Sequence, residues 1–173
     1  GVFIDDTTTA LLSTVRVDDT TGGAAVEISD GTTVTMNGVD VNTVNGGHGV
    51  LVQNNTNTTL TNVDVDNVNG AAFSGIFVDH DSSAVSNVTI TGSDITNGDG
   101  VGISYDRDAN ATSRLTLTGN NVNTVTTGLQ GISLDLDGSA DSNITINGNN
   151  QINAGGNEAL LVATNGNLGK IVR

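Results

Sequence analysis

Three Asp-x-Asp segments contain the residues of this chain best suited to chemistry. They are Asp79-His80-Asp81, Asp106-Arg107-Asp108 and Asp135-Leu136-Asp137. Each segment follows the same short apolar phrase, so equivalent aspartates are expected to stack if the chain repeats its path. Carboxylates held that close together raise one another's pKa or require a cation between them. The segments therefore predict an acidic site made of two columns of aspartates.

Calcium is the cation that this arrangement favours. It is a hard ion that accepts several carboxylate and carbonyl oxygens in loose geometry. The predicted ligands are Asp79, Asp81, Asp106, Asp108, Asp135 and Asp137. The alternative is a solvated acidic edge whose side chains splay apart.

The same carboxylates permit an enzymatic alternative. Glycosidases use two carboxylates, one as the acid and one as the base or nucleophile. Asp79, Asp106 and Asp135 are the candidates for such a role, and Arg107 and Arg114 are the nearest basic residues. Sugar subsites usually use aromatic platforms, and Phe77 alone offers one here. We therefore expect no catalytic site, with these three aspartates as the residues to test.

A repeated phrase positions these residues. It reads small residue, apolar, any residue, apolar, and then a polar turn. The small residues that begin it are Gly1, Ala25, Gly49, Gly75, Gly102, Gly131 and Ala159, which are spaced 24–29 residues apart. A drifting period of this size indicates a solenoid whose loops vary in length. Because strand side chains alternate, the apolar pair is expected to face inward.

Two further short strands follow in each repeat. Val34-Thr35-Met36 and Val88-Thr89-Ile90 exemplify the second, and Val39-Asp40-Val41 exemplifies the third. Asn and Gly between them suit a tight corner, because both tolerate left-handed backbone conformations. The pattern predicts an all-β fold: a right-handed three-sided parallel β-helix of about seven coils of 24–29 residues. Its right-handedness follows the usual crossover of parallel strands.

The repeat resembles a known family. Ser86 to Ile95, followed by Gly102-Ile103-Ser104, is similar to the β-helix repeat of the pectin-lyase-like superfamily. That superfamily includes polysaccharide lyases, glycoside hydrolases, phage tailspikes and surface adhesins. Gly47-His48-Gly49 is similar to a short signature of polygalacturonases, but the other carboxylate motifs of that family are missing from the neighbouring coils. The resemblance implies the fold and leaves the activity open.

A threonine array is predicted on the outer side of the second strand. Its members are Thr35, Thr59, Thr61, Thr89, Thr91, Thr116, Thr118 and Thr145. Flat, regular Thr-x-Thr rows are the feature that β-helical ice-binding proteins share. The alternative is an ordinary strand surface, because threonine is favoured there.

Composition excludes some classes of partner. Five Lys and Arg residues stand against 19 Asp and Glu residues, for a formal net charge of −14. Binding to nucleic acid depends on basic residues, so no nucleic-acid partner is expected. No apolar run is long enough to cross a bilayer, so no membrane insertion is expected. The chain has no cysteine, which excludes disulfides.

Together these features favour a non-catalytic structural or adhesive module of a secreted or cell-surface protein or filament. Residues 1–173 are expected to form a single β-helix domain, as a segment of a longer solenoid or as a stacking subunit. The expected partners are other copies stacked end to end, neighbouring solenoid segments, or polysaccharide. The alternatives are a carbohydrate-binding or carbohydrate-cleaving domain that uses calcium, and an ice-binding protein.

Overall fold

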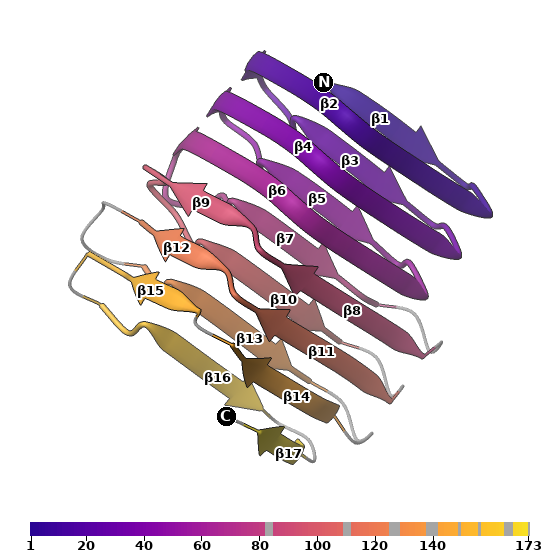
Figure 1. Ribbon diagram of the computed structural model, residues 1–173, viewed down its shortest axis with the longest axis vertical. Coiled ribbons are helices and arrows are strands. Elements are labelled where there is room, and N and C mark those ends of the chain that lie inside the picture. The colour runs from indigo at the N-terminus through magenta and orange to yellow at the C-terminus, as the bar shows by residue number, and fades with distance from the viewer. Residues whose placement is uncertain are drawn as a thin grey trace.

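The chain winds through two β-sheets whose strands alternate along the sequence (Figure 1). The computed structural model describes residues 1–81, 85–108, 112–124, 129–137, 142–148, 150–155, 157–164 and 168–172. Within these residues, sheet A contains seven strands: β1 (Val2–Asp5), β3 (Val26–Ser29), β5 (Val50–Gln53), β7 (Ile76–Asp79), β10 (Ile103–Arg107), β13 (Ile132–Leu136) and β16 (Leu160–Thr164). Sheet B contains the long strands β2 (Thr9–Thr21), β4 (Thr33–Asn45) and β6 (Asn57–Asn69), and the shorter strands β8 (Ser86–Thr91), β9 (Asp94–Thr96), β11 (Ser113–Thr118), β12 (Asn121–Asn123), β14 (Ser142–Asn147), β15 (Gln151–Asn153) and β17 (Leu168–Val172).

Neighbouring coils pair in parallel, and among the described strands their register is continuous except between β14 and β17, where it shifts after Ser142. In sheet A, Ile76 pairs with Ile103, which pairs with Ile132. The same register runs from Val2 to Leu160, so the predicted inward columns are confirmed position by position. The predicted parallel β-helix is therefore confirmed.

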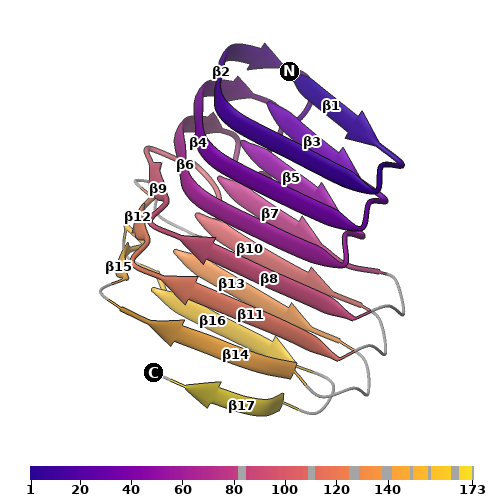
Figure 2. The same ribbon diagram turned by 45° about the vertical axis from the view of Figure 1, so that its right-hand side comes forward.

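A corner folds sheet B into two faces, which makes the solenoid three-sided. Backbone φ is positive there at Thr14, Gly38, Asn62, Gly92, Gly119 and Gly148. In the first three coils the chain passes the corner within one continuous strand, and Figure 2 shows β2, β4 and β6 curving around it. In later coils the strand is interrupted, as between β8 and β9. The sequence identifies the Asn and Gly corners, whereas Thr14 carries no such signal.

The core is a narrow column of apolar side chains from all three sides. In the fourth coil, Ile76 from sheet A and Ile90 and Ile95 from sheet B are each at most 1% exposed. β-branched and Leu side chains dominate it, as expected of strands with one buried face. In the described residues, no helix is long and apolar enough to cross a membrane.

Polar side chains satisfy the backbone at the corner. The Ser93 amide donates to Asn120 Oδ1 (3.0 Å), and the Asn120 amide donates to Asn150 Oδ1 (2.9 Å). Asn120, with no exposed surface, also donates through Nδ2 to the Ile90 carbonyl (3.0 Å). This polar ladder joins three successive coils and satisfies buried groups that would otherwise destabilise the fold.

The glycine that begins each repeat is small because the third strand of the same coil packs against it. A Cβ on Gly102 would overlap Val122 Cγ1 and lie 2.7 Å from the Gly131 carbonyl oxygen. The equivalent Cβ on Gly75 would overlap Ile95 Cγ2. Small residues at this position therefore set the distance between two sides of the solenoid.

We predict that Gly102→Ala lowers the free energy of unfolding by about 1–3 kcal/mol, because overpacking forces a buried backbone apart. Urea and thermal unfolding followed by circular dichroism measure the change. Gly23→Ala is the matched control, since a Cβ there meets no atom within 4 Å. Equal stability of the two variants would contradict the packing role of Gly102.

Candidate functional site

Three aspartates near the carboxyl ends of the sheet A strands β7, β10 and β13 lie side by side on its outer face. Asp79 pairs with Asp106, and Asp106 pairs with Asp135. Paired positions on neighbouring strands are about 4.8 Å apart. These three residues form the first acidic column, in the register that the sequence spacing predicts.

A second acidic column, formed by Asp81, Asp108 and Asp137, runs beside the first. Repulsion by Asp79 is the main cause that raises the pKa of Asp81. Burial, followed by repulsion from Asp137 and Asp108, raises the pKa of Asp135. The two columns therefore interact as one cluster of negative charge.

Asp106 is the most perturbed member of this cluster. Partial burial is the first cause, and repulsion by Asp108, Asp135, Asp79 and Asp81 adds to it, so that the pKa of Asp106 rises to about 6. It lies in the middle coil, between charged residues on both sides. Partial burial, together with this position between charged coils, therefore raises the pKa of Asp106.

Hydrogen bonding divides the acidic cluster into satisfied and unsatisfied members. Gln53 Nε2 donates to Asp79 Oδ2 (2.9 Å) from the preceding coil. In contrast, Oδ1 of Asp106 and Oδ1 of Asp137 are buried and have no hydrogen-bond partner within the described part of the chain. No group of three His, Cys, Asp or Glu side chains among the described residues is arranged to hold a metal ion. The acidic cluster thus offers carboxylate oxygens as metal ligands, but its described residues do not form a preformed metal site.

The residues between these aspartates point inward. His80 is 1% exposed and Arg107 is 0% exposed. Arg107 lies within β10, where strand alternation turns its side chain into the core between Asp106 and Asp108. A buried guanidinium is placed away from any substrate on the outer face, so the expectation that Arg107 could serve as a nearby base is wrong. Arg114 lies on the outer side of sheet B.

Buried polar side chains continue inside the same coils. Tyr105, which is 1% exposed, donates through its hydroxyl to Ser86 Oγ (3.5 Å). Ser113 and Ser142 pair through their hydroxyls (3.0 Å). This serine stack gives the core behind the acidic columns a polar lining.

The Gly-His-Gly segment lies at the opposite end of the strand from the acidic columns. His48 precedes β5, whereas the aspartate columns follow the strands of sheet A. The His48 ring packs against Phe73 (5.5 Å between centroids) and Phe77 (4.8 Å), and Nδ1 accepts a hydrogen bond from the Ser74 amide (2.9 Å). Burial lowers the pKa of His48. The structure does not bring His48 and the aspartates together as one catalytic group.

The predicted threonines occupy two columns on the outer side of sheet B. One contains Thr35, Thr59, Thr89, Thr116 and Thr145, and the other contains Thr61, Thr91 and Thr118 between Asn37 and Asn147. Each position pairs in register with the next. We call this surface, on β4, β6, β8, β11 and β14, the threonine face.

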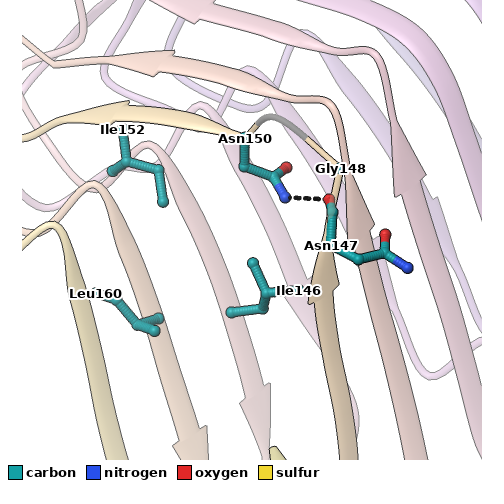
Figure 3. A pocket seen from close by; sticks show the side chains of 6 residues that line it. All are labelled: Ile146, Asn147, Gly148, Asn150, Ile152 and Leu160. Atoms are coloured by element: carbon teal, nitrogen blue, oxygen red, sulfur yellow. Dashed lines mark hydrogen bonds between the residues drawn. The ribbon is translucent and has the colours of Figure 1, made fainter. Parts of the chain in front are cut away.

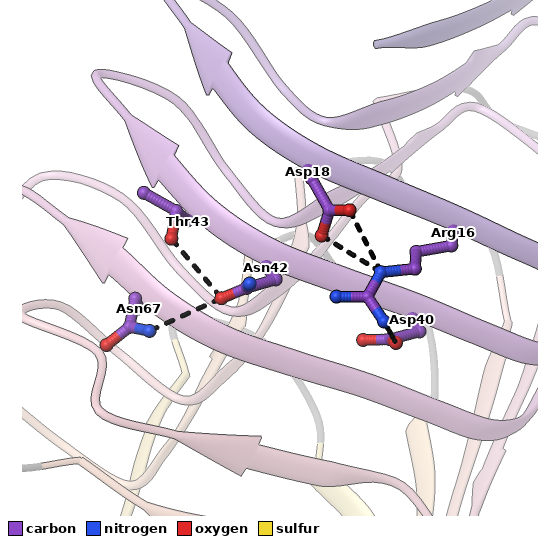
Figure 4. Close-up of polar contacts among 6 residues, drawn as sticks. All are labelled: Arg16, Asp18, Asp40, Asn42, Thr43 and Asn67. Carbon is purple, nitrogen blue, oxygen red and sulfur yellow. Dashed lines mark hydrogen bonds and ion pairs between the residues drawn. The ribbon is translucent and has the colours of Figure 1, made fainter.

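A third outer surface also carries acidic residues, which the sequence analysis missed. Arg16 pairs with Asp40, and Asp64 lies between Asp40 and Asp94 in the same column. Figure 4 shows Arg16 bridging Asp18 (2.9 Å) and Asp40 (3.6 Å). The hydrogen bond from Arg16 is the main cause that lowers the pKa of Asp18, whereas burial, followed by repulsion from Asp94 and Asp40, raises that of Asp64. Arg16, Asp40 and Asp64 recur at the repeat spacing in the third strand, and this recurrence in the sequence indicates a charged column.

Pockets in the described residues lie beside the strands β12, β14, β15 and β16. The first has a volume of about 330 Å³ and is lined by Ile146, Ile152 and Leu160, one from each side of the solenoid, together with Asn147, Gly148 and Asn150 (Figure 3). It lies against the core column beside β14, β15 and β16. The second, of about 380 Å³, is a polar depression lined by Asn121, Asn123, Gln151, Ile152 and Asn153. Neither pocket contains an aspartate of the acidic columns.

We predict that Asp106→Asn raises stability at pH 7 by on the order of 1 kcal/mol, which is the linkage effect reduced for solvent screening. The folded pKa near 6 lies above the ordinary value of about 3.9. The folded state therefore binds more protons between pH 4 and 6, and the stability associated with Asp106 is lost as the pH rises through that window.

Melting temperatures from pH 4 to 7 measure this effect, and the variant should lose part of the wild-type decline. Asp19→Asn is the control, because Asp19 is exposed in the first coil and Asn tolerates its positive φ of 54°. An unchanged pH slope in Asp106→Asn would contradict the assignment.

Comparison with known proteins supports the architecture. A family model described as a right-handed β-helix region matches residues 1–170. Searches of curated proteins and of solved structures gave no significant match. The family agrees with the resemblance to the pectin-lyase-like superfamily and gives the solenoid its right hand. With parallel, in-register coils along the described residues, the chain belongs to the right-handed β-helix family.

Proposed function

We propose that this chain is a non-catalytic structural or adhesive module of a secreted or cell-surface protein or filament. The observation that carries the proposal is the in-register stacking of the sheet A strands from β1 to β16. A parallel ladder joins each coil to the next, and polar ladders such as Ser93–Asn120–Asn150 reinforce the corner. Such a solenoid is a stiff support that repeats its outer side chains at a fixed spacing.

Repetition suits adhesion because one weak contact is made many times. Each outer face presents the same kind of residue on successive coils: aspartates on sheet A, threonines on one side of sheet B, and acidic or amide groups on the third side. Several weak contacts on one rigid support bind far more tightly than one contact alone. We therefore propose a polymer with its own repeat, such as a polysaccharide, as the first partner.

A neighbouring solenoid coil is the second proposed partner. Ile146, Ile152 and Leu160 give the first pocket an apolar lining (Figure 3), and a stacked coil would cover these groups. The coil could belong to a second copy or to an adjoining solenoid segment. Stacking of this kind extends the parallel ladder through the same backbone hydrogen bonds that join the coils.

Calcium binding at the acidic columns is a second candidate function. The buried, unpartnered Oδ1 atoms of Asp106 and Asp137 favour it, because a buried carboxylate oxygen without a donor is costly. Asp79, Asp106 and Asp135, with Asp81, Asp108 and Asp137 beside them, would supply carboxylate oxygens. Since they form no ready cage, waters or a polysaccharide would complete the coordination.

Carbohydrate cleavage is the remaining alternative for the same surface. The raised pKa of Asp106 suits a general acid, and Asp79 and Asp135 lie on either side as carboxylates. Arg107 is buried and does not complete a lyase site. We therefore place binding before cleavage.

We predict that the protein is retained by polysaccharide without cutting it. Affinity electrophoresis in gels that contain neutral or acidic polysaccharides measures retention, and a reducing-end assay measures cleavage. Retention with no new chain ends is expected for the wild type. Chain ends that appear with the wild type and vanish with Asp106→Asn would replace the adhesive assignment with an enzymatic one.

We predict that millimolar calcium raises the melting temperature of the wild type relative to EDTA, because a ligand of the folded state stabilises it by mass action. Asp106→Asn should lose most of that rise. Asp64→Asn, in the acidic column of the third face, is the matched control and should keep it. Equal loss in both variants, or no calcium effect in the wild type, would contradict a site at the sheet A columns.

A further inference from the structure

The threonine face is a two-dimensional array. Five strands, β4, β6, β8, β11 and β14, lie side by side (Figure 2), and their equivalent residues pair in register. In three of them, two threonines are separated by one inward residue: Thr59 and Thr61, Thr89 and Thr91, Thr116 and Thr118. Every one of these positions is at least partly exposed.

The array has fixed spacings in both directions. Coils are about 4.8 Å apart, and alternate residues along a strand are roughly 6.6 Å apart. Threonine is stiff at χ1, so its hydroxyl and methyl groups keep their places better than those of an unbranched side chain. The spacing between coils is near the short repeat distance between water oxygens in hexagonal ice. Water bound by one threonine is thus placed to continue into an ice-like lattice at the next.

The charge of this face differs from that of the other two. On the threonine face, the outward residues of the five strands are Thr or Asn except for Arg114. Sheet A carries the acidic columns, and the third side carries Asp40, Asp64 and Asp94. A neutral, hydroxyl-bearing face in a chain of net charge −14 is complementary to a neutral, hydrogen-bonding partner.

Side-chain contacts within the face favour a lattice over a flexible ligand. Thr118 Oγ1 donates to Asn147 Oδ1, and Asn87 Nδ2 donates to Asn57 Oδ1 (3.1 Å). These bonds run from coil to coil and hold the edges of the array. In the central column, Thr59, Thr89 and Thr116 pair in register, so equivalent side chains repeat with the spacing of the coils.

We infer that the threonine face binds ice. It orders water through the hydroxyl and methyl groups of Thr59, Thr89, Thr116 and Thr145, with Thr61, Thr91 and Thr118 as the parallel column. The inference is independent of adhesion and of the acidic columns, because a different side of the solenoid carries it.

The test is ice shaping and inhibition of ice recrystallisation by the whole protein. The wild type should facet growing crystals and keep grains small. Thr116→Tyr and Thr89→Tyr should lose both effects, because a large ring at the centre of the array lifts the face from the crystal. Ser104→Tyr, on the outer side of sheet A, is the matched control and should behave like the wild type.

Melting temperatures establish that each variant is folded before its activity is compared. A folded Thr116→Tyr with wild-type ice activity would overturn the inference, as would a wild type that leaves ice unshaped. Loss of activity in Ser104→Tyr as well would also overturn it, because the effect would not belong to this face. If the threonine variants instead lose retention by a neutral polysaccharide while ice is never shaped, the face binds glycan and ice is excluded.

Discussion

Parallel, in-register hydrogen bonding between neighbouring coils is the constraint on which the rest of this structure depends. It sets each coil about 4.8 Å from the next and pairs equivalent strand residues, as Ile103 pairs with Ile76 on one side and Ile132 on the other. A side chain chosen in one coil is therefore repeated as a column. Repetition multiplies favourable contacts in the core, and it multiplies repulsion where the repeated residue is charged. The pKa of Asp106 is raised by partial burial first, and that repulsion raises it further.

The buried polar groups of the described coils differ in hydrogen bonding: most of those named here have partners, whereas two carboxylate oxygens have none. At the corner, Asn120 is fully buried and its amide group bonds to neighbouring coils on both sides. Behind sheet A, Tyr105 reaches Ser86, and Ser113 reaches Ser142. In the acidic columns, Asp106 Oδ1 and Asp137 Oδ1 are buried without a partner among the described residues. Natural proteins tend to break their own packing rules at functional sites, which singles out these columns.

The fold could be predicted in detail because its signal is periodic. Gly49, Gly75 and Gly102 mark the start of successive coils, and alternation then fixes which side chains face inward. The register of Asp79, Asp106 and Asp135 follows from the same spacing. The alternation of inward and outward side chains does not show how far a strand continues. The burial of His80 and Arg107, just after the predicted strand residues, was therefore missed. The Asp40, Asp64 and Asp94 column was overlooked because a single charged residue between two valines is ordinary in an exposed strand.

The pairing of residues 24–30 positions apart has a mechanical consequence. Every coil is joined only to its two neighbours, and the hydrogen bonds between coils run along the axis of the stack. A pull on the two ends therefore loads one coil interface at a time, and the stack peels open from an end. Each coil that is released lengthens the chain by roughly 80–100 Å. Stretching such a solenoid would extend it in steps, and each step would absorb work before the next coil is exposed.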